Sequence, residues 1–93
     1  MHIEHKQNDR RGLFFIEGDQ GIISQLTYDK KGDHLVIDHT ETIRPEESKG
    51  YASKLVKHVV DYAREHNFTI DPLCPFAEVQ FDQNPSYADV RAS

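Results

Sequence analysis

A chain of 93 residues with five Phe, four Tyr and 37% hydrophobic residues has the length and composition of a single small domain, residues 1–93. Its formal net charge of −5 argues against general binding to nucleic acid, which needs a clustered excess of Lys and Arg. No apolar run is long enough to cross a membrane, and the N-terminal residues lack the apolar core of a signal peptide. The single cysteine cannot form an internal disulfide, so we expect a cytoplasmic protein.

The first half of the chain has the patterns of three strands joined by two tight turns. Residues 11–17 contain the run Leu-Phe-Phe-Ile, which is apolar on both faces and predicts a strand inside a sheet. The turn sequences GDQG at 18–21 and KKGD at 30–33 bracket an alternating strand over 22–28. A longer strand over 34–43 becomes polar towards its end, which suggests that it runs out of the core into a site. Its expected row on one face is Leu35, Ile37, His39, Glu41 and Ile43.

The second half is predicted to be helical around one short strand. Pro45 followed by two glutamates indicates a helix start, with Ser48 a candidate N-cap. Asn67 suits the C-terminal end of this helix, because Asn tolerates the left-handed backbone conformation found there. A strand over 68–71 and a short helix over 76–81 follow. The residues that recur at helical spacing in the long helix are Ala52, Leu55, Val56, Val59, Val60 and Ala63.

The turn that contains Gly50 lies between the long strand and the long helix. Backbone N–H groups at a helix start are unpaired and the helix dipole favours negative charge there, so this turn could hold a phosphate or pyrophosphate. A single glycine at a helix start is, by itself, more often only a turn. Cys74 lies between Pro72 and Pro75, just past the next strand, so the turn and the thiol could face one cleft.

The order of these features resembles that of the GCN5-related N-acetyltransferases, in particular a branch of very small, single-domain members with a cysteine after the fifth strand. The resemblance covers roughly residues 12–90, and it also includes the closing sequence Asn-Pro-Ser-Tyr. Its most specific segments are ASKLV at 52–56, DYARE at 61–65 and PLCPF at 72–76. It implies an α/β (α+β) fold in which a mostly antiparallel, splayed sheet carries one long helix and a short C-terminal helix.

The resemblance also implies acetyl-CoA as cosubstrate and no metal. Residues 47–52 occupy the family's acetyl-CoA loop, where Gly50 and Ala52 match the pattern and Glu47 puts an acid in place of a cation or amide. By the same resemblance, the pantetheine arm would bond to the backbone of the third strand and the pyrophosphate would lie on the helix start. The implied cofactor-binding residues are Ile37, Asp38, His39, Thr40, Lys49, Gly50, Tyr51, Ala52, Ser53 and Lys54.

Three side chains are candidates for the chemistry of acetyl transfer. Cys74 is either an acyl carrier or a buried wall of the acetyl pocket. His39 is a base or a structural histidine, and Tyr87 is either a proton donor to the departing thiolate or a packing residue. Glu41 is interpreted as a solvated strand residue, although this strand carries the base in many members of the family. The other histidines lack the spacing of zinc ligands, so no metal site is expected.

The implied function is acetyl-CoA-dependent N-acetyl transfer. Residues 3–13 leave no room for the helices that form an acceptor pocket in larger family members, so the expected acceptor is an exposed amine on a peptide, a protein lysine or a polyamine. Neither nucleic acid nor a membrane is expected as a partner. Two other interpretations remain open, a CoA-binding or regulatory module without turnover and a plain protein-interaction domain.

Overall fold

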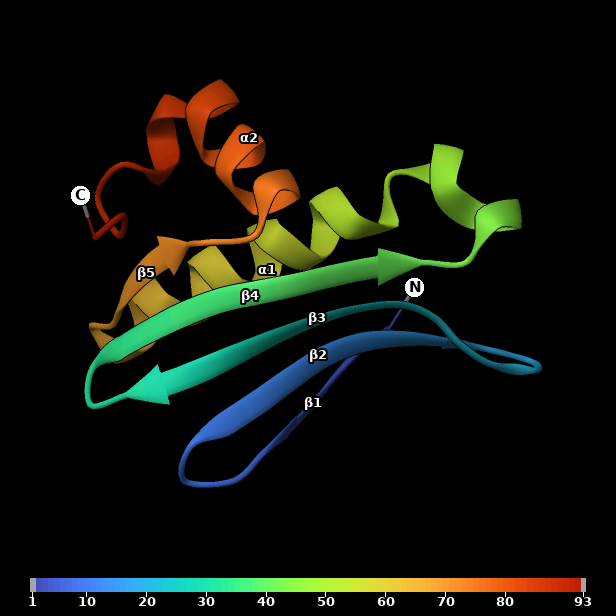
Figure 1. The fold of residues 1–93 in the computed structure, drawn as a ribbon, viewed down its shortest axis with the longest axis horizontal. Helices are drawn as coiled ribbons and strands as arrows, with labels where there is room; N and C mark the ends of the chain where they lie inside the picture. Colours follow the sequence, from blue (N-terminus) through green and yellow to red (C-terminus); the bar gives the residue numbers. More distant parts are fainter. Residues whose placement is uncertain (1, 93) are drawn as a thin grey trace.

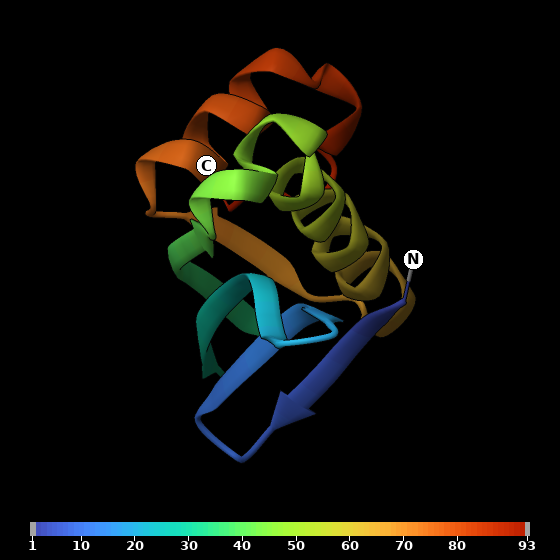
Figure 2. The ribbon, with the colours of Figure 1, turned by 90° about the vertical axis from the view of Figure 1, so that its right-hand side faces the viewer.

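The computed structural model describes residues 2–92, which form a five-stranded sheet with helices packed against it (Figure 1). The strand order is β1-β2-β3-β4-β5, with antiparallel pairing except between β4 and β5, which are parallel. Long helix α1 lies along one face of the sheet and α2 packs against β5 and β4 (Figure 2). The strands are β1 Ile3–Gln7, β2 Arg11–Gly18, β3 Gly21–Lys31, β4 His34–Thr42 and β5 Thr69–Pro72. The helices are η1 Arg44–Lys49, α1 Tyr51–His66, α2 Pro75–Gln83 and η2 Pro85–Tyr87.

The mixed sheet and the two helices confirm the predicted fold, and β2 lies inside the sheet as expected. Strand β1 was not predicted. Its sequence is polar and only half-buried, and it pairs with β2 at the edge of the sheet. The hairpin between them is fixed by Asn8, whose side-chain oxygen accepts hydrogen bonds from the backbone amides of Arg10 and Arg11 at 2.8 and 2.9 Å.

The N-cap predicted at Ser48 is wrong, whereas the turn at Gly50 lies directly before the long helix as expected. Pro45 is the second residue of the short 3₁₀ helix η1, which begins at Arg44, and α1 begins only at Tyr51, so Ser48 is not its N-cap. Gly50 takes the capping position with a φ of 77°, a left-handed conformation that glycine adopts at little cost. The C-terminal prediction is confirmed, because Asn67 ends α1 with a φ of 59°.

A β-bulge in β4 changes the face on which its second half presents its side chains. Ile37 pairs with Tyr28 while His39 pairs with Thr27, so Asp38 is the extra residue of the bulge. Directly paired residues of antiparallel strands point to the same face. The prediction that alternate side chains from Leu35 to Ile43 share one face is therefore wrong. The shared face ends at Ile37, and His39 lies on the opposite face of the sheet.

The bulge instead turns Thr40 and Thr42 to the helix side. They pair with Leu26 and Ser24, which are both buried beneath the helices. Thr42 Oγ1 lies 2.8 Å from the hydroxyl of Ser24, so the buried Ser24 has a hydrogen-bond partner. The largest side chains of the core are Tyr28, Phe14, Leu26, Leu35, Ile37, Leu55 and Ile70.

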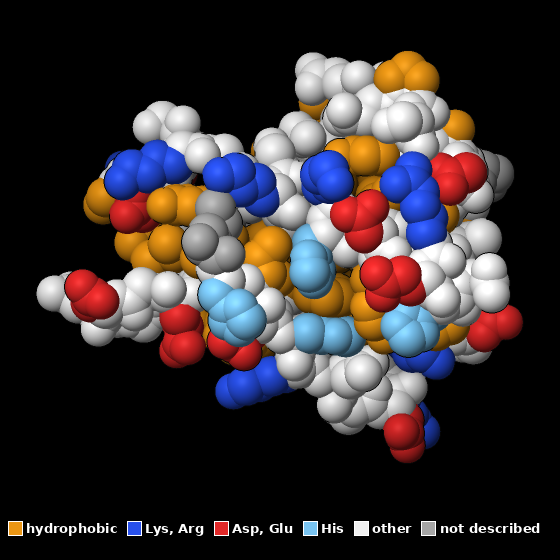
Figure 3. Space-filling model, turned by 180° about the vertical axis from the view of Figure 1, so that it is seen from behind, with side chains coloured by type: hydrophobic (Ala, Val, Ile, Leu, Met, Phe, Trp, Pro, Cys, Tyr) orange, Lys and Arg blue, Asp and Glu red, His pale blue; other side chains and the backbone are white. Residues whose placement is uncertain are grey.

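Histidines gather on the face that Figure 3 shows, around the aromatic side chains that join β1 and β2 to α1. The ring of His5 stacks on Phe14 at 3.9 Å, and its Nε2 lies 2.7 Å from the hydroxyl of Tyr28. Burial lowers the pKa of His5, and the nearby His58 and His66 lower it further. The docking of β1 therefore depends on a histidine that resists protonation.

Candidate active site

The two parallel strands β4 and β5 part halfway along β4. Ile37 and Pro72 form their last pair, and the amide of Cys74 still donates to the Ile37 carbonyl at 2.9 Å. Beyond this point the chain turns into α2, and the remaining residues of β4 pair only with β3 among those that the structure describes. An open pocket of about 420 Å³ lies along the freed strand, lined by Thr40, Glu41, Thr42, Glu47, Ala52 and Phe76.

Two helices begin at this pocket. The first backbone bond of α1 runs from the Lys54 amide to the Gly50 carbonyl, so the amides of Tyr51, Ala52 and Ser53 have no acceptor in the preceding turn. Helix α2 begins directly after Cys74, whose carbonyl accepts the Glu78 amide at 2.9 Å. Since helix N-termini carry partial positive charge, both favour a negatively charged group in the pocket between them.

Charged side chains add little positive potential at the start of α1. Lys49 Nζ lies 2.6 Å from a carboxylate oxygen of Glu46, and this close contact with an acid raises the pKa of Lys49. Lys54 extends over the ring of Tyr51, 5.9 Å from its centroid. Glu47 lines the pocket itself, where it opposes an anionic ligand. Attraction for an anion at this turn therefore depends mainly on main-chain N–H groups.

Cys74 is buried beside the pocket, with a side chain that meets Thr40. It is 7% exposed, and its Sγ lies 3.5 Å from Thr40 Oγ1. Thr40 was expected only as a backbone contact for a cofactor, and its approach to the thiol was not predicted. The pairing follows from the bulge at Asp38, which a pattern of single residues along one strand does not reveal.

His39 and Tyr87, the other two predicted catalytic residues, are not brought together with Cys74. The side chain of His39 is 58% exposed on the opposite face of β4, with Nε2 3.7 Å from a carboxylate oxygen of Glu41. Tyr87 is buried in η2, beyond the far end of α2 from Cys74, where its ring packs edge-on against Phe81.

Only the backbone groups of Ile37 and Asp38 are free to contact a ligand, because both side chains are engaged elsewhere. Ile37 is fully buried in the core. Asp38 Oδ2 accepts a hydrogen bond from Arg11 at 2.9 Å, and Asp38 Oδ1 accepts one from Thr27 at 2.6 Å. Burial raises the pKa of the Asp38 carboxyl, but these hydrogen bonds outweigh it and lower the pKa below its usual value. Asp38 thus fixes the bulge from the outer face.

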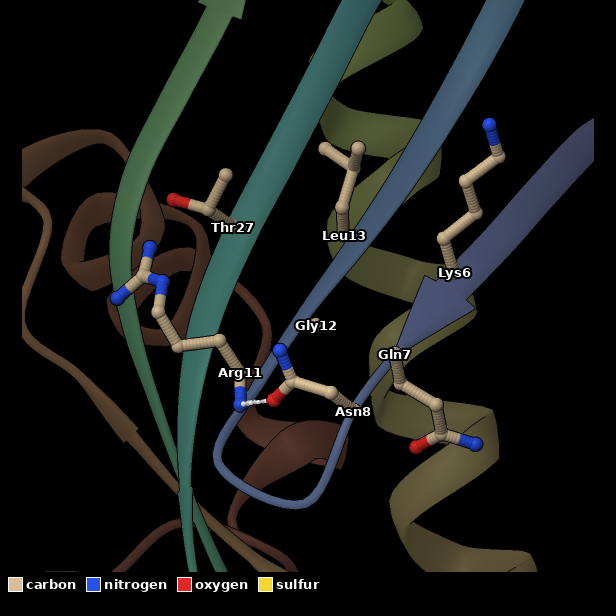
Figure 4. Close-up of a pocket in the computed structure, with 7 residues that line it drawn as sticks. All are labelled: Lys6, Gln7, Asn8, Arg11, Gly12, Leu13 and Thr27. Atoms are coloured by element: carbon tan, nitrogen blue, oxygen red, sulfur yellow. Dashed lines mark hydrogen bonds between the residues drawn. The ribbon is translucent and has the colours of Figure 1, made fainter.

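A separate hollow of about 350 Å³ lies on the sheet near the β1–β2 hairpin (Figure 4). Its walls include Lys6, Arg11, Leu13 and Thr27, which extend from three neighbouring strands (Figure 4). The Arg11 guanidinium is already paired with Asp29 and Asp38. None of the residues that line the β4–β5 pocket lines this hollow, so the two do not share a wall.

Comparison with known proteins assigns this architecture to a family. The sequence model of the GCN5-related N-acetyltransferases matches residues 13–90. The chain belongs to this family. The parted strands, the glycine turn and the long helix are therefore those of an acetyltransferase fold, which confirms the resemblance seen in the sequence. No curated protein matches the chain in sequence.

Three solved acetyltransferase structures share the fold to different extents. A GCN5-like candidate N-acetyltransferase from Staphylococcus aureus is 32% identical, with a TM-score of 0.74, over 97% of this chain and 88% of that one. A ribosomal-protein-alanine N-acetyltransferase from Brucella melitensis is 16% identical, with a TM-score of 0.58, over 94% and 67%. Nourseothricin acetyltransferase is 18% identical, with a TM-score of 0.56, over 67% of this chain but 39% of its own. The last two show the fold alone.

Within residues 2–92, no three His, Cys, Asp or Glu side chains are grouped in a way that could hold a metal ion. The helices of this part of the chain are also too short or too polar to cross a membrane.

Proposed function

We propose that this family member is an acetyl-CoA-dependent N-acetyltransferase that acts on an exposed amine. The observation that carries the proposal is the pocket where β4 and β5 part, because two helix N-termini and an unpaired strand edge meet there beside a buried thiol. Each supplies a contact that a long, anionic thioester needs. The whole chain, residues 1–93, would act as one minimal catalytic domain.

The binding part of the proposal relies on backbone groups. The amides of Tyr51, Ala52 and Ser53, next to Gly50, would hold the pyrophosphate. The pantetheine amides would pair with the free edge of β4 beyond Ile37, in the place that a neighbouring strand would take. Lys49 and Lys54 would add charge close to the phosphates once the ligand competes with their present contacts.

Two chemical routes fit the position of Cys74. In the direct route, the neutral amine attacks the thioester carbonyl, the C–N bond forms, the C–S bond breaks and CoA leaves as a thiolate that takes up a proton. In the covalent route, the Cys74 thiolate first takes the acetyl group and the amine then attacks the acetyl-cysteine, which restores the thiol. In either route the N-terminus of α2 would stabilise the oxyanion.

The other candidate side chains differ in what supports them. Thr40 could donate a hydrogen bond to the sulfur or the oxyanion, since its hydroxyl already lies 3.5 Å from Cys74 Sγ. His39 is proposed as the base for an amine that approaches from the outer face, where it lies next to Glu41. Tyr87 has no part in the proposal, because it is buried at the other end of α2.

The test combines a binding measurement with a covalent one. Titration calorimetry with CoA and acetyl-CoA should give saturable heat, and a ligand at a hundred times its dissociation constant should add about 2.7 kcal/mol of stability. If Cys74 carries the acetyl group, incubation with acetyl-CoA should add one acetyl mass that hydroxylamine removes and that Cys74→Ala does not acquire. A Cys74→Ala variant that still transfers acetyl at the wild-type rate would establish the direct route.

A CoA-binding module without turnover is the second candidate, favoured by the position of Glu47 in the pocket. It predicts binding of CoA with no acetyl transfer to any amine of a panel. No binding of either ligand would reject both candidates and leave an interaction domain.

A further inference from the structure

The start of α2 exposes two aliphatic side chains close to the buried thiol. Leu73 is 64% exposed and Val79 is 46% exposed, although Cys74 between them in the chain is buried. The chain turns directly from β5 into α2 at this point (Figure 1). The other two large apolar side chains that are exposed in the described part of the chain, Ile22 and Ile43, lie at the start of β3 and just after β4.

The exposure of Leu73 follows from the way in which α2 begins. Cys74 is the N-cap of α2, so Leu73 is the residue before the N-cap. A hydrophobic residue at this position often packs against an apolar residue at the fourth helical position, which here is Glu78. The Glu78 amide donates to the Cys74 carbonyl at 2.9 Å, and this turn brings Glu78 close to Leu73. A carboxylate therefore lies where an apolar contact would otherwise cover Leu73.

Leu73, Glu78 and Val79, which we call the α2 patch, adjoin the β4–β5 pocket without lining it. Phe76 lines the pocket and lies three residues before Val79, so the two are neighbours on the surface of α2. Glu78 is one helical turn from Cys74, about 5.4 Å along the axis. The proposed cosubstrate follows the edge of β4, whereas the α2 patch lies on the side of β5 and α2. The patch therefore reaches the thiol without using the space proposed for the cosubstrate.

The charges around the thiol favour a cationic partner. Residues 71–83 contain Asp71, Glu78 and Asp82 but no Lys, Arg or His. Asp82 is paired with Arg91 at 2.9 Å, whereas the exposed Glu78 forms no ion pair with any residue that the structure describes. An unpaired carboxylate next to exposed aliphatic side chains is complementary to a partner that carries a basic group and an apolar group together.

We propose that the α2 patch docks the acceptor, a protein segment in which the acetylated lysine has an aliphatic and a basic residue as neighbours. The inference rests on the proposed function, because it assigns the amine to the thioester at Cys74 and the neighbouring residues to the patch. The aliphatic residue would cover Leu73 and Val79, and the basic residue would pair with Glu78. A lysine suits a buried thiol because its amine lies at the end of a flexible four-carbon stem. A polyamine has no aliphatic side chain for the patch.

The first experiment measures kcat/KM for acetyl transfer to an N-terminally blocked peptide with Leu and Arg next to its single Lys. Replacing Leu by Gly, or Arg by Gln, in the peptide should each lower kcat/KM about fivefold, a modest effect because the patch is exposed. Leu73→Ser and Val79→Ser should each reduce the effect of the Leu to less than about twofold, and Glu78→Gln should do the same for the Arg. Ile22→Ser and Glu65→Gln, which make the same kinds of change at exposed residues outside the patch, should preserve both effects.

A second readout separates this inference from the proposed function. Methyl NMR should show shifts at Leu73 and Val79 on addition of the blocked peptide with Leu and Arg, and not with the peptide in which Gly replaces Leu, whether or not acetyl transfer occurs. Shifts without transfer would support the patch and contradict the enzyme. Transfer with equal kcat/KM for all three peptides, or preferences that the patch variants leave intact, would overturn the patch alone. No shift at these methyls, or faster transfer to an unblocked peptide without Lys, would also overturn the proposal.

Discussion

Deletion of Asp38 tests whether the bulge opens the pocket. Asp38 is the extra residue of β4, and the last β4–β5 pair, Ile37 with Pro72, lies immediately before it. A bulge bends its strand and increases its twist, so it accounts for the parting of the two strands at this point. Without Asp38, Ile37 and His39 would become neighbours and keep their present partners in β3. The sheet would then retain its register while β4 straightens towards the start of α2.

The cost in stability can be estimated from the two side-chain contacts that are lost. Hydrogen bonds to a charged group contribute roughly 1.5–3 kcal/mol, and the partial exposure of Arg11 reduces this, so we expect a loss of about 1–2 kcal/mol. Asp38→Ala is the matched control, because it loses the same contacts but keeps the extra residue. The two variants should therefore unfold at similar urea concentrations.

Binding of CoA should distinguish them. The deletion variant should lose at least about tenfold in affinity relative to Asp38→Ala, equivalent to 1.4 kcal/mol, because the straightened strand narrows the space for the ligand. Titration calorimetry measures the affinities, and circular dichroism establishes that both variants are folded. A folded deletion variant that binds CoA within twofold of the control would refute the assignment of this role to the bulge.

Three further predictions concern the helix start and the histidine cluster. Gly50→Glu should abolish CoA binding in calorimetry whereas Gly50→Ala should only weaken it, since both strain a left-handed backbone by about 1–2 kcal/mol but only Glu adds a carboxylate. Loss of binding in both would mean that backbone conformation alone matters. Glu47→Gln should tighten CoA binding by up to about 1 kcal/mol, and weaker binding would assign Glu47 a different contact. The free energy of unfolding should fall as the pH drops below about 6.5, because the unfolded chain then binds a proton that folded His5 resists. His5→Gln should flatten this pH dependence in urea titrations at pH 7.5 and 5.5, and an unchanged slope would assign it to other groups.

Features set by local backbone chemistry could be predicted from the sequence. The turns around Gly21 and Gly32 and the end of α1 at Asn67 all have positive φ values, which few residues other than Gly and Asn adopt readily. The buried face of α1 follows directly from helical spacing, from Leu55 to Ala63. These predictions required no knowledge of which strands are neighbours.

Features that depend on pairing between distant segments could not be predicted. The bulge is a shift in the pairing of β3 with β4, which the sequence of one strand does not reveal. Strict alternation along β4 therefore placed His39 on the face where Thr40 meets Cys74. Strand β1 carries a polar sequence whose burial comes from stacking of His5 on Phe14. The start of α1 was predicted too early, because Pro45 belongs to the preceding 3₁₀ helix η1.

Main-chain groups supply most of the expected contacts to the cosubstrate, which explains how Glu47 could be tolerated in a turn that would bind phosphate. The amides at the start of α1 and the free edge of β4 are independent of side-chain identity, so Glu47 would weaken binding of the cosubstrate without removing any donor. Substitutions of turn residues other than Gly50 should therefore change mainly the affinity for the cosubstrate.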